Sequence, residues 1–193
     1  MAINAGNVLV GSPDQKTTGA ILDAPLGTPL PKAATEAPDA KFEDSGFISE
    51  DGVVLTVDVS TDTIKDWSAS TVRKVLSDFN GTIKWTELEM SKKALERAFG
   101  KDAVKTKAAD QTHGTQTEVA IGAVLPEARS WVFKIKDGKK RVLIVVPNGQ
   151  ASLADDISFV SSEAATVAIE LACSPDANGK NIYIYTDDGV AAA

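Results

Sequence analysis

Few side chains in this sequence are of the types that perform covalent catalysis or bind transition metals. The 193 residues include one histidine, His113, and one cysteine, Cys173, which lie far apart in the sequence. A typical zinc site needs three or four clustered ligands, so these two residues cannot form one. His113 lies in the polar segment QTHGTQ, which we expect to be an exposed loop, and no G-x-S-x-G motif supplies a serine nucleophile. Cys173 lies in an apolar run and is predicted to be buried.

The remaining candidate motifs are typical of turns and not of binding sites. Adjacent carboxylates occur at Glu50-Asp51, Asp155-Asp156 and Asp187-Asp188, near predicted turns and strand ends, where solvated acidic side chains are ordinary. Neither a G-x-x-x-x-G-K-[ST] phosphate loop nor a G-x-G-x-x-G motif is present. We therefore predict a protein that is not an enzyme and that uses no metal and no cofactor.

The charge balance indicates which partners suit the chain. Its formal net charge is −7, and its basic cluster at residues 139–141 is short. Proteins that coat nucleic acid need clustered lysine and arginine, so an acidic chain is suited to staying soluble or to repelling DNA. The sequence has neither an apolar run of about 18 residues nor an N-terminal secretory signal. We therefore expect no membrane association and an initial location in a cytosol.

Alternating side chains predict that most of residues 46–173 form β-strands. In segment 53–60 the odd positions are apolar, namely Val53, Leu55, Val57 and Val59. The even positions are mostly polar and include Thr56, Asp58 and Ser60. Farther along, Thr82, Lys84 and Thr86 alternate with Ile83 and Trp85 in the same way. This period of two indicates strands that have one buried face and one polar face.

Pairs of turn-forming residues separate the predicted strands at short, even intervals. The pairs are Asn80-Gly81, Asp137-Gly138, Asn148-Gly149 and Asn178-Gly179. Such pairs are favoured in two-residue hairpin turns, because these turns need positive φ angles. We therefore predict that residues 72–79 pair with residues 81–88. The whole pattern predicts that residues 46–188 form a β-sandwich or barrel.

One helix and one extended arm complete the predicted organisation. Residues 91–99 place apolar side chains on one stripe, with Ser91 as the N-cap and Gly100 as the stop. Residues 1–45 hold five of the eight prolines, which excludes a central strand or a long helix there. We predict an extended N-terminal arm at 1–45 and a short C-terminal tail at 189–193.

Three short runs occur in a specific order and spacing. They are A-P-x-G-T-x-L-P at residues 24–31, G-[FY]-[IV]-S-E-D-G at 46–52 and W-x-x-x-T-V-R at 67–73. With their flanking segments, 19–53 and 60–100, these runs resemble the first half of the major tail tube proteins of siphophages that infect actinobacteria. The rest of the chain is similar to this family only in its strand pattern.

The resemblance implies a mainly β fold, a sandwich or barrel of the tail-tube type with one flanking helix and an extended N-terminal arm. It implies that six copies form a ring and that rings stack into a hollow, non-contractile tube that conducts DNA. The implied partners are further copies of the chain, the tape measure protein inside the tube, and the tail terminator and tail tip proteins. The implied location is the virion tail, after synthesis in the host cytoplasm.

Two sets of residues are the candidate functional positions under this resemblance. The polar strand positions are predicted to line the bore: Thr56, Asp58, Ser60, Thr82, Lys84 and Thr86. Apolar residues of the arm are predicted to contact a neighbouring copy: Val8, Leu9, Val10, Ile21, Leu22, Leu26 and Leu30. An arm that orders only on docking offsets its entropy loss with new contacts. We therefore expect a chain without residues 1–40 to fold but not to polymerise.

Other functions stay open on sequence grounds. A capsid decoration or head–tail joining protein would share the β-structure but form trimers or a single ring. A tube subunit of a contractile injection system would have a similar sandwich and would also assemble as hexamers. A carbohydrate-binding module would display aromatic side chains on one exposed face. Here Trp67, Trp85 and Trp131 mostly occupy apolar strand positions, which predicts that they pack in the core.

Overall fold

The computed structural model describes residues 8–14 and 19–190, and its architecture is mainly β with one α-helix. The strands are β1 (Ser12–Pro13), β2 (Ile21–Pro25), β3 (Glu43–Asp44), β4 (Val54–Lys65), β5 (Thr71–Glu87), β6 (Val104–Lys107), β7 (Gln116–Val119), β8 (Arg129–Asp137), β9 (Lys140–Leu153), β10 (Val167–Ser174) and β11 (Tyr183–Asp187). The helices are α1 (Lys92–Phe99) and the 3₁₀ turn η2 (Lys101–Ala103). The predicted fold class is confirmed. Residues 1–7 and 15–18 of the predicted arm, and 191–193 of the predicted tail, lie outside the described residues.

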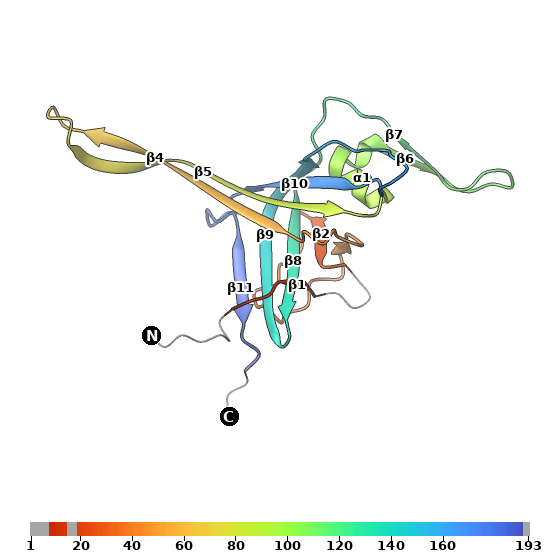
Figure 1. Ribbon diagram of the computed structural model, residues 1–193, viewed down its shortest axis with the longest axis horizontal. Helices are drawn as coiled ribbons and strands as arrows, with labels where there is room; N and C mark the ends of the chain where they lie inside the picture. Colours follow the sequence, from red (N-terminus) through yellow and green to blue (C-terminus); the bar gives the residue numbers. More distant parts are fainter. Residues whose placement is uncertain (1–7, 15–18, 191–193) are drawn as a thin grey trace.

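Nine strands form one antiparallel sheet that folds over on itself. Its order is β3-β2-β8-β9-β10-β5-β4, with β1 added to β8 and β11 added to β9. The long strand β9 belongs to both halves, because its first part pairs with β8 and β11 whereas residues 148–153 pair with β10. In Figure 1, β8 and β9 run across β10 and β5. The two halves thereby form the two layers of a sandwich.

The larger core lies between these two layers. Trp85 of β5 contacts Trp131 and Phe133 of β8, with ring centroids 5.3 and 5.5 Å apart. All three rings are buried, together with Ile83 and Ile169. Aromatic side chains bury about 150–250 Å² each, so this trio is a main link between the layers. The predicted core positions of Trp85 and Trp131 are confirmed.

The N-terminal zone contributes to the fold and is not one free arm. Strand β2 pairs with both β3 and β8, and Ile21 and Leu22 are 0% and 7% exposed within their own chain. Leu30 and Phe42 then join a second core on the outer side of β8 and β9. Removing residues 1–40 would therefore take away β2 and part of both cores. Because these residues are part of the core, we do not expect such a truncated chain to fold.

Two of the predicted hairpin turns lie inside strands. Asn80-Gly81 is part of β5 and Asn148-Gly149 is part of β9. A Cβ atom at Gly149 would lie 2.8 Å from Leu171 Cδ1 and 2.9 Å from Trp131 Cδ1. The glycine is required because large core side chains approach the backbone closely, which is the other common reason for glycine in a strand.

The other two predicted turns are present. Gly138 and Gly179 have φ angles of 58° and 69°, the left-handed region that favours glycine. Gly138 joins β8 to β9, and Gly179 lies between β10 and β11. Whether an Asn-Gly or Asp-Gly pair turns the chain therefore depends on its tertiary surroundings.

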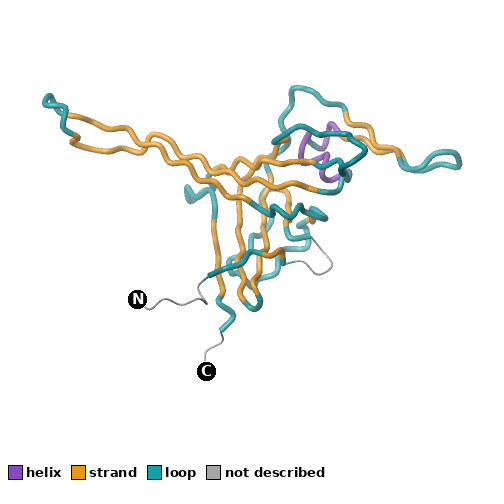
Figure 2. The backbone as a smooth tube through the Cα atoms, viewed as in Figure 1, coloured by secondary structure: helices purple, strands orange, loops and turns teal. Residues whose placement is uncertain are grey.

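Strands β4 and β5 form one long hairpin that projects from the sandwich (Figure 2). β5 is continuous from Thr71 to Glu87, so the predicted pairing of 72–79 with 81–88 is wrong. The chain reverses instead at residues 66–70, where Asp66 Oδ1 accepts hydrogen bonds from Ser70 N at 2.9 Å and Ser68 Oγ at 2.7 Å. A loop held by an aspartate side chain thus reverses the chain, in place of the predicted two-residue Asn80-Gly81 turn.

Helix α1 covers one end of the sandwich, and the predicted caps are present. Ser91 Oγ accepts a hydrogen bond from Ala94 N at 3.2 Å, and Gly100, at φ 94°, donates from its N–H to Glu96 O at 2.8 Å. The small hairpin β6–β7 follows α1 and points away from the β4–β5 hairpin (Figure 1). Within the described residues, none of the helices has the length and apolar character needed to cross a bilayer.

Candidate functional site

The polar positions predicted from strand alternation lie on one face of a four-stranded part of the sheet, β9-β10-β5-β4. Thr56 is paired with Thr82, and Lys84 is paired with Val54 on one side and Glu170 on the other. Directly paired residues share a face, and so do residues two apart on a strand. The polar side of these strands therefore contains all six predicted residues: Thr56, Asp58, Ser60, Thr82, Lys84 and Thr86. Asp58, Ser60 and Lys84 are exposed, Thr56 and Thr86 are half-buried, and Thr82 is buried among its neighbours.

The charges on this polar face are mainly acidic. Lys84 Nζ lies 2.7 Å from Glu170 Oε2, and this partly exposed pair neutralises itself. Farther out, Asp58 is paired with Asn80, and Asp78 is paired with Ser60. Two further carboxylates thus lie on the same face. A partly exposed ion pair contributes at most about 1 kcal/mol to stability. Stabilisation of the fold therefore does not account for the charged side chains on this face.

The opposite face of the same hairpin is apolar. At its base, Leu55 and Ile83 pack in the larger core. The apolar phase then continues along the projecting part, where the side chains are exposed: Val57, Val59, Leu76 and Phe79. We call these four residues the outer stripe. Leu76 joins this face because the register shifts between Ser60 and Thr61, so that Leu76 pairs with Thr61. Contiguous exposed apolar side chains rimmed by polar ones mark a surface that another protein covers.

Two edges of this four-stranded region have unpaired backbone groups. β4 is the last strand of the sheet, and residues 150–153 of β9 pair only with β10 within the described chain. A long, exposed edge strand presents a row of N–H and C=O groups that another strand can pair with. The region can therefore be extended from both sides by other chains.

The apolar residues assigned to the arm divide into two groups. Ile21 and Leu22 are core residues and Leu30 is partly buried in the second core, so these three pack within their own chain. The remaining four are exposed, namely Val8, Leu9, Val10 and Leu26. The segment that bears the first three is held beside the β8–β9 turn, where Val10 N donates to Asp137 Oδ2 at 3.2 Å.

Trp67 lies at the tip of the β4–β5 hairpin and is 104% exposed. The prediction that Trp67 packs in the core is wrong, because no second layer of the sandwich reaches the tip. The tip itself is ordered by hydrogen bonds from Asp66 N to Ser70 O at 2.9 Å and from Ala69 N to Asp66 O at 3.0 Å. Ala69 adopts a positive φ of 63° within this loop. The loop thus presents an indole to solvent in a defined position.

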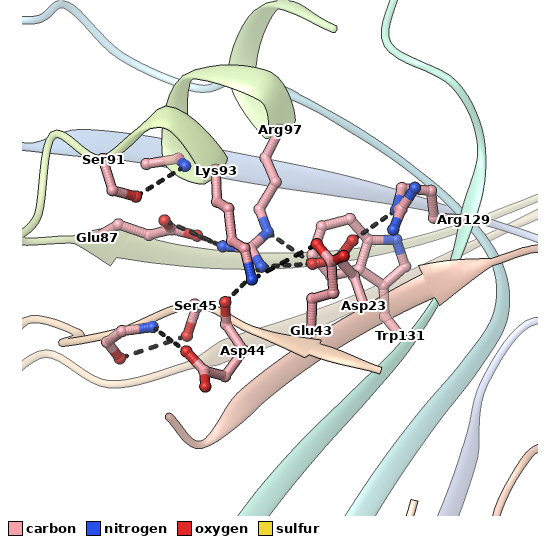
Figure 3. Close-up of polar contacts among 12 residues, drawn as sticks. Asp23, Glu43, Asp44, Ser45, Glu87, Ser91, Lys93, Arg97, Arg129 and Trp131 are labelled. Carbon is pink, nitrogen blue, oxygen red and sulfur yellow. Dashed lines mark hydrogen bonds and ion pairs between the residues drawn. The ribbon is translucent and has the colours of Figure 1, made fainter. Parts of the chain in front are cut away.

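A buried ionic network links α1 to both layers of the sandwich (Figure 3). Arg97 of α1 donates from Nε to Asp23 Oδ1 of β2 at 2.8 Å and from Nη1 to Glu87 Oε1 of β5 at 3.1 Å. Trp85 Nε1 also donates to Glu87, at 3.1 Å, and Arg129 Nε donates to Asp23 Oδ2. The four charged groups therefore satisfy one another in a largely buried position.

The electrostatics of this network follow from its burial. Burial raises the pKa of Glu87, and the charge of Arg97 offsets this only in part. Burial lowers the pKa of Arg97, but the nearby carboxylates of Asp23 and Glu87 raise it by more than burial lowers it. The net pKa is therefore raised, and the guanidinium stays charged. The adjoining cavity is about 30 Å³, the space of about one water molecule. The contacts of Arg97 with β2 and β5 fix α1 on the sandwich.

Sequence patterns contained a signal for this network that the prediction missed. Glu87 continues the apolar phase of Ile83 and Trp85, and Arg97 lies three residues after Ala94 on the buried stripe of α1. Opposite charges at two positions that the pattern assigns to the core are a candidate buried pair. Asp23 carries no such signal, because its neighbours do not alternate clearly.

Reactive groups outside this network are explained by local structure. Burial raises the pKa of Cys173 to about 12, so its thiol stays protonated. His113 is in the β6–β7 turn, where Asp110 Oδ1 accepts from the backbone N of Thr112 and of His113, both at 2.8 Å. In the described ranges, no group of three or more histidine, cysteine, aspartate or glutamate residues is placed to hold a metal ion.

Comparison with known proteins gives a match to one family model and similarities to solved structures. The sequence model of a family described as phage tail tube protein matches residues 1–193. No curated protein matches the chain in sequence. Among solved structures, the chain is similar to the tube-terminating cap of the anti-feeding prophage. That similarity has 15% sequence identity and a TM-score of 0.46, covering 97% of this chain and 100% of the cap chain.

Proposed function

Because the chain belongs to the phage tail tube protein family, we propose that six copies form a ring and that stacked rings form the hollow tube of a non-contractile tail. As a member of this family the chain is a structural protein of the virion tail that assembles with itself and with other tail components. The tube conducts DNA to the host and performs no chemistry on it. The tape measure protein fills the tube before ejection, and the terminator and tip proteins close its two ends. Before assembly the subunit is in the host cytoplasm.

The observation that carries the proposal is the four-stranded region with one polar face, one apolar face and two unpaired edges. Six such regions joined edge to edge would close into a barrel, which removes every exposed edge. β4 of one copy would pair beside residues 150–153 of the next. The polar face would then line an aqueous bore, and the apolar face would stay on the core side.

The charge of the polar face suits the passage of DNA. Asp58 and Asp78 add negative charge, and Lys84 is neutralised by Glu170 at 2.7 Å. A bore that presents carboxylates and hydroxyls repels phosphates and offers them few cationic contacts, so the genome slides without binding. The proposed lining consists of the six predicted residues: Thr56, Asp58, Ser60, Thr82, Lys84 and Thr86.

Contacts between copies would use the exposed apolar segments. The outer stripe would lie on the body of a neighbouring copy, because it continues the core-side phase of the hairpin. The segment that holds Val8, Leu9 and Val10, together with Leu26, would contact an adjacent copy or ring. Both surfaces would bury apolar area only on assembly. Each Å² removed from water contributes about 25 cal/mol of favourable free energy to association.

Electron microscopy of the purified chain, fresh and after concentration, tests the proposal. Hollow tubes or stacked six-fold rings are the expected result, and cryo-electron microscopy of these would show which residues face the bore. Closed trimers or isolated twelve-fold rings would overturn the proposal. A dry interface over Thr56 and Asp58 would overturn the assignment of the lining alone.

Charge reversal at Asp58 and Asp78 tests the role of the bore. Tubes with arginine at both positions are expected to form but to release DNA more slowly, since the bore then attracts phosphates. The matched control is Asp187→Arg, which lies on β11 outside the four-stranded region. Equal release from both variants would show that the face is not in contact with passing DNA.

A further inference from the structure

We infer that the indole of Trp67 inserts into a groove on a neighbouring copy of the chain, between the N-terminal strand β1 and residues 48–53. This inference rests on the proposed function, and it names the contact that joins one subunit to the next. The groove has a volume of about 320 Å³. Its lining includes five large apolar residues: Ile21, Ile48, Val53, Phe133 and Ile135.

Trp67 cannot reach the groove of its own chain. β4 begins at Val54, next to the groove residue Val53, and runs twelve residues away from the groove before the tip. At about 3.3 Å per residue, this separates the tip from the groove by roughly 40 Å. Figure 1 shows the tip at the far end of the projecting hairpin, away from β1. The occupant of the groove is therefore the tip of another copy.

The tip is organised before it binds. Asp66 accepts from Ser68 and Ser70 and its own N–H donates to Ser70 O, so the five-residue loop is held by its own hydrogen bonds. A large aromatic side chain on an ordered loop loses little conformational entropy on docking. Tryptophan is also the side chain most often found at the energetic centre of protein interfaces.

The charges of the two surfaces are complementary. Residues 63–74 of the hairpin include three basic side chains, Lys65, Arg73 and Lys74, and one acidic side chain, Asp66. The groove is lined by Glu50 and Asp51, both exposed, and by Lys134. A basic tip thus meets an acidic mouth, which selects this pairing over tip-to-tip contact.

The groove also contains the one buried side-chain oxygen in the described residues that lacks a hydrogen-bond partner, Ser49 Oγ. Buried polar atoms of native proteins are nearly always paired, so an unpaired one points to a missing partner. The indole Nε1–H of an inserted Trp67 is a donor of the required kind. The groove thus combines apolar side chains with hydrogen-bond acceptors, which suits an indole.

The geometry of this contact agrees with open-ended assembly. Tip and groove are different surfaces, so each copy that donates its tip still has a free groove. Such heterologous contacts generate rings or helical filaments and not closed two-fold dimers. The Trp67 contact therefore adds a directional link between one subunit and the next.

Fluorescence quenching of the assembled protein tests the inference. Trp85 and Trp131 are 3% and 1% exposed, so Trp67 is the tryptophan that acrylamide reaches in the free chain. Quenching is expected to fall at least threefold on assembly, and a Trp67→Phe chain, which keeps an aromatic tip, supplies the background. Assembled tubes in which Trp67 remains as quenchable as in monomers would overturn the inference and leave the proposed function standing.

Disulfide trapping identifies the partner surface. The double variant Ser70→Cys, Glu50→Cys keeps Trp67 and puts one cysteine in the exposed tip loop, so it is expected to give a ladder of cross-linked oligomers on oxidation of the assembled protein. Cys173 does not interfere because it is buried. The control pair is Ser70→Cys, Asp187→Cys, which puts the second cysteine on β11. A ladder of equal strength from the control, or none from the Glu50 pair in intact tubes, would overturn the inference. Trapped chains that form closed trimers would overturn the proposed function but not the docking contact.

Discussion

Arg97 of α1 and Glu87 of β5 form a buried ion pair with an Nη1–Oε1 distance of 3.1 Å, and neither residue is more than 5% exposed. The pair is continued by Asp23 of β2, so a single guanidinium connects the helix to both layers of the sandwich. Breaking a buried pair leaves an uncompensated charge, whereas an intact pair is close to neutral in energy. The network therefore fixes the position of α1 without adding much to the total stability.

Replacing Arg97 by methionine is expected to lower the free energy of unfolding by about 3–5 kcal/mol, because Glu87 and Asp23 then stay buried without their common partner. Urea denaturation of the monomer measures the change. Lys93→Met is the matched control on the same helix, since Lys93 Nζ lies 3.5 Å from Glu43 in a half-exposed pair that contributes about 0–1 kcal/mol. Similar losses in both variants would contradict a special role for Arg97.

The stability of the protein is expected to depend on pH through Glu87. Burial raises its pKa above the ordinary 4.5, so the folded state holds this proton more tightly than the unfolded state. The resulting contribution to folding is present below pH 4.5 and is lost as the pH rises through the folded-state pKa. Urea unfolding over a pH series, for the wild type and Glu87→Gln, isolates this contribution. The stability difference, wild type minus variant, should fall as the pH rises above 4.5; a constant or rising difference would contradict the assignment.

Substituting Gly149 by alanine should destabilise the fold by about 1–3 kcal/mol, as overpacking of a core does. The new methyl group would lie within 2.9 Å of Leu171 and Trp131, both buried. Thermal denaturation measures the loss. Gly114→Ala is the control, because nothing lies within 4 Å of a Cβ there. A neutral Gly149→Ala would mean that the backbone of β9 can move away from the core.

Polar substitution of the outer stripe is expected to separate folding from assembly. Val59→Thr with Phe79→Asn removes exposed apolar surface, so the free energy of unfolding of the monomer should change by no more than about 0.5 kcal/mol. Self-association should weaken at least tenfold, measured by sedimentation as the concentration needed to form polymers. The control is Ile121→Thr with Val124→Thr, two exposed apolar residues in the segment between β7 and β8. Normal polymerisation of the stripe variant would show that this surface remains uncovered in the tube.

The sequence by itself determined the faces of the strands, the helix and its caps, and the family. Thr56 and Asp58 alternate with Val57 and Val59, and this period of two assigns them to one side of a strand wherever that strand is placed. Capping of α1 by Ser91 and Gly100 is equally local, because the cap bonds reach only a few residues along the chain.

Tertiary structure alone decided which of these local signals is used and what is buried. Asn80-Gly81 and Asn178-Gly179 are the same dipeptide, yet the first lies within β5, where a Cβ on its glycine would contact Ile182, and the second turns the chain. Trp67 and Trp85 are both strand-like in pattern, but only Trp85 is covered by a second layer. Asp23, Glu87 and Arg97 are far apart in sequence, and they become partners only because burial excludes the water that would otherwise solvate each charge.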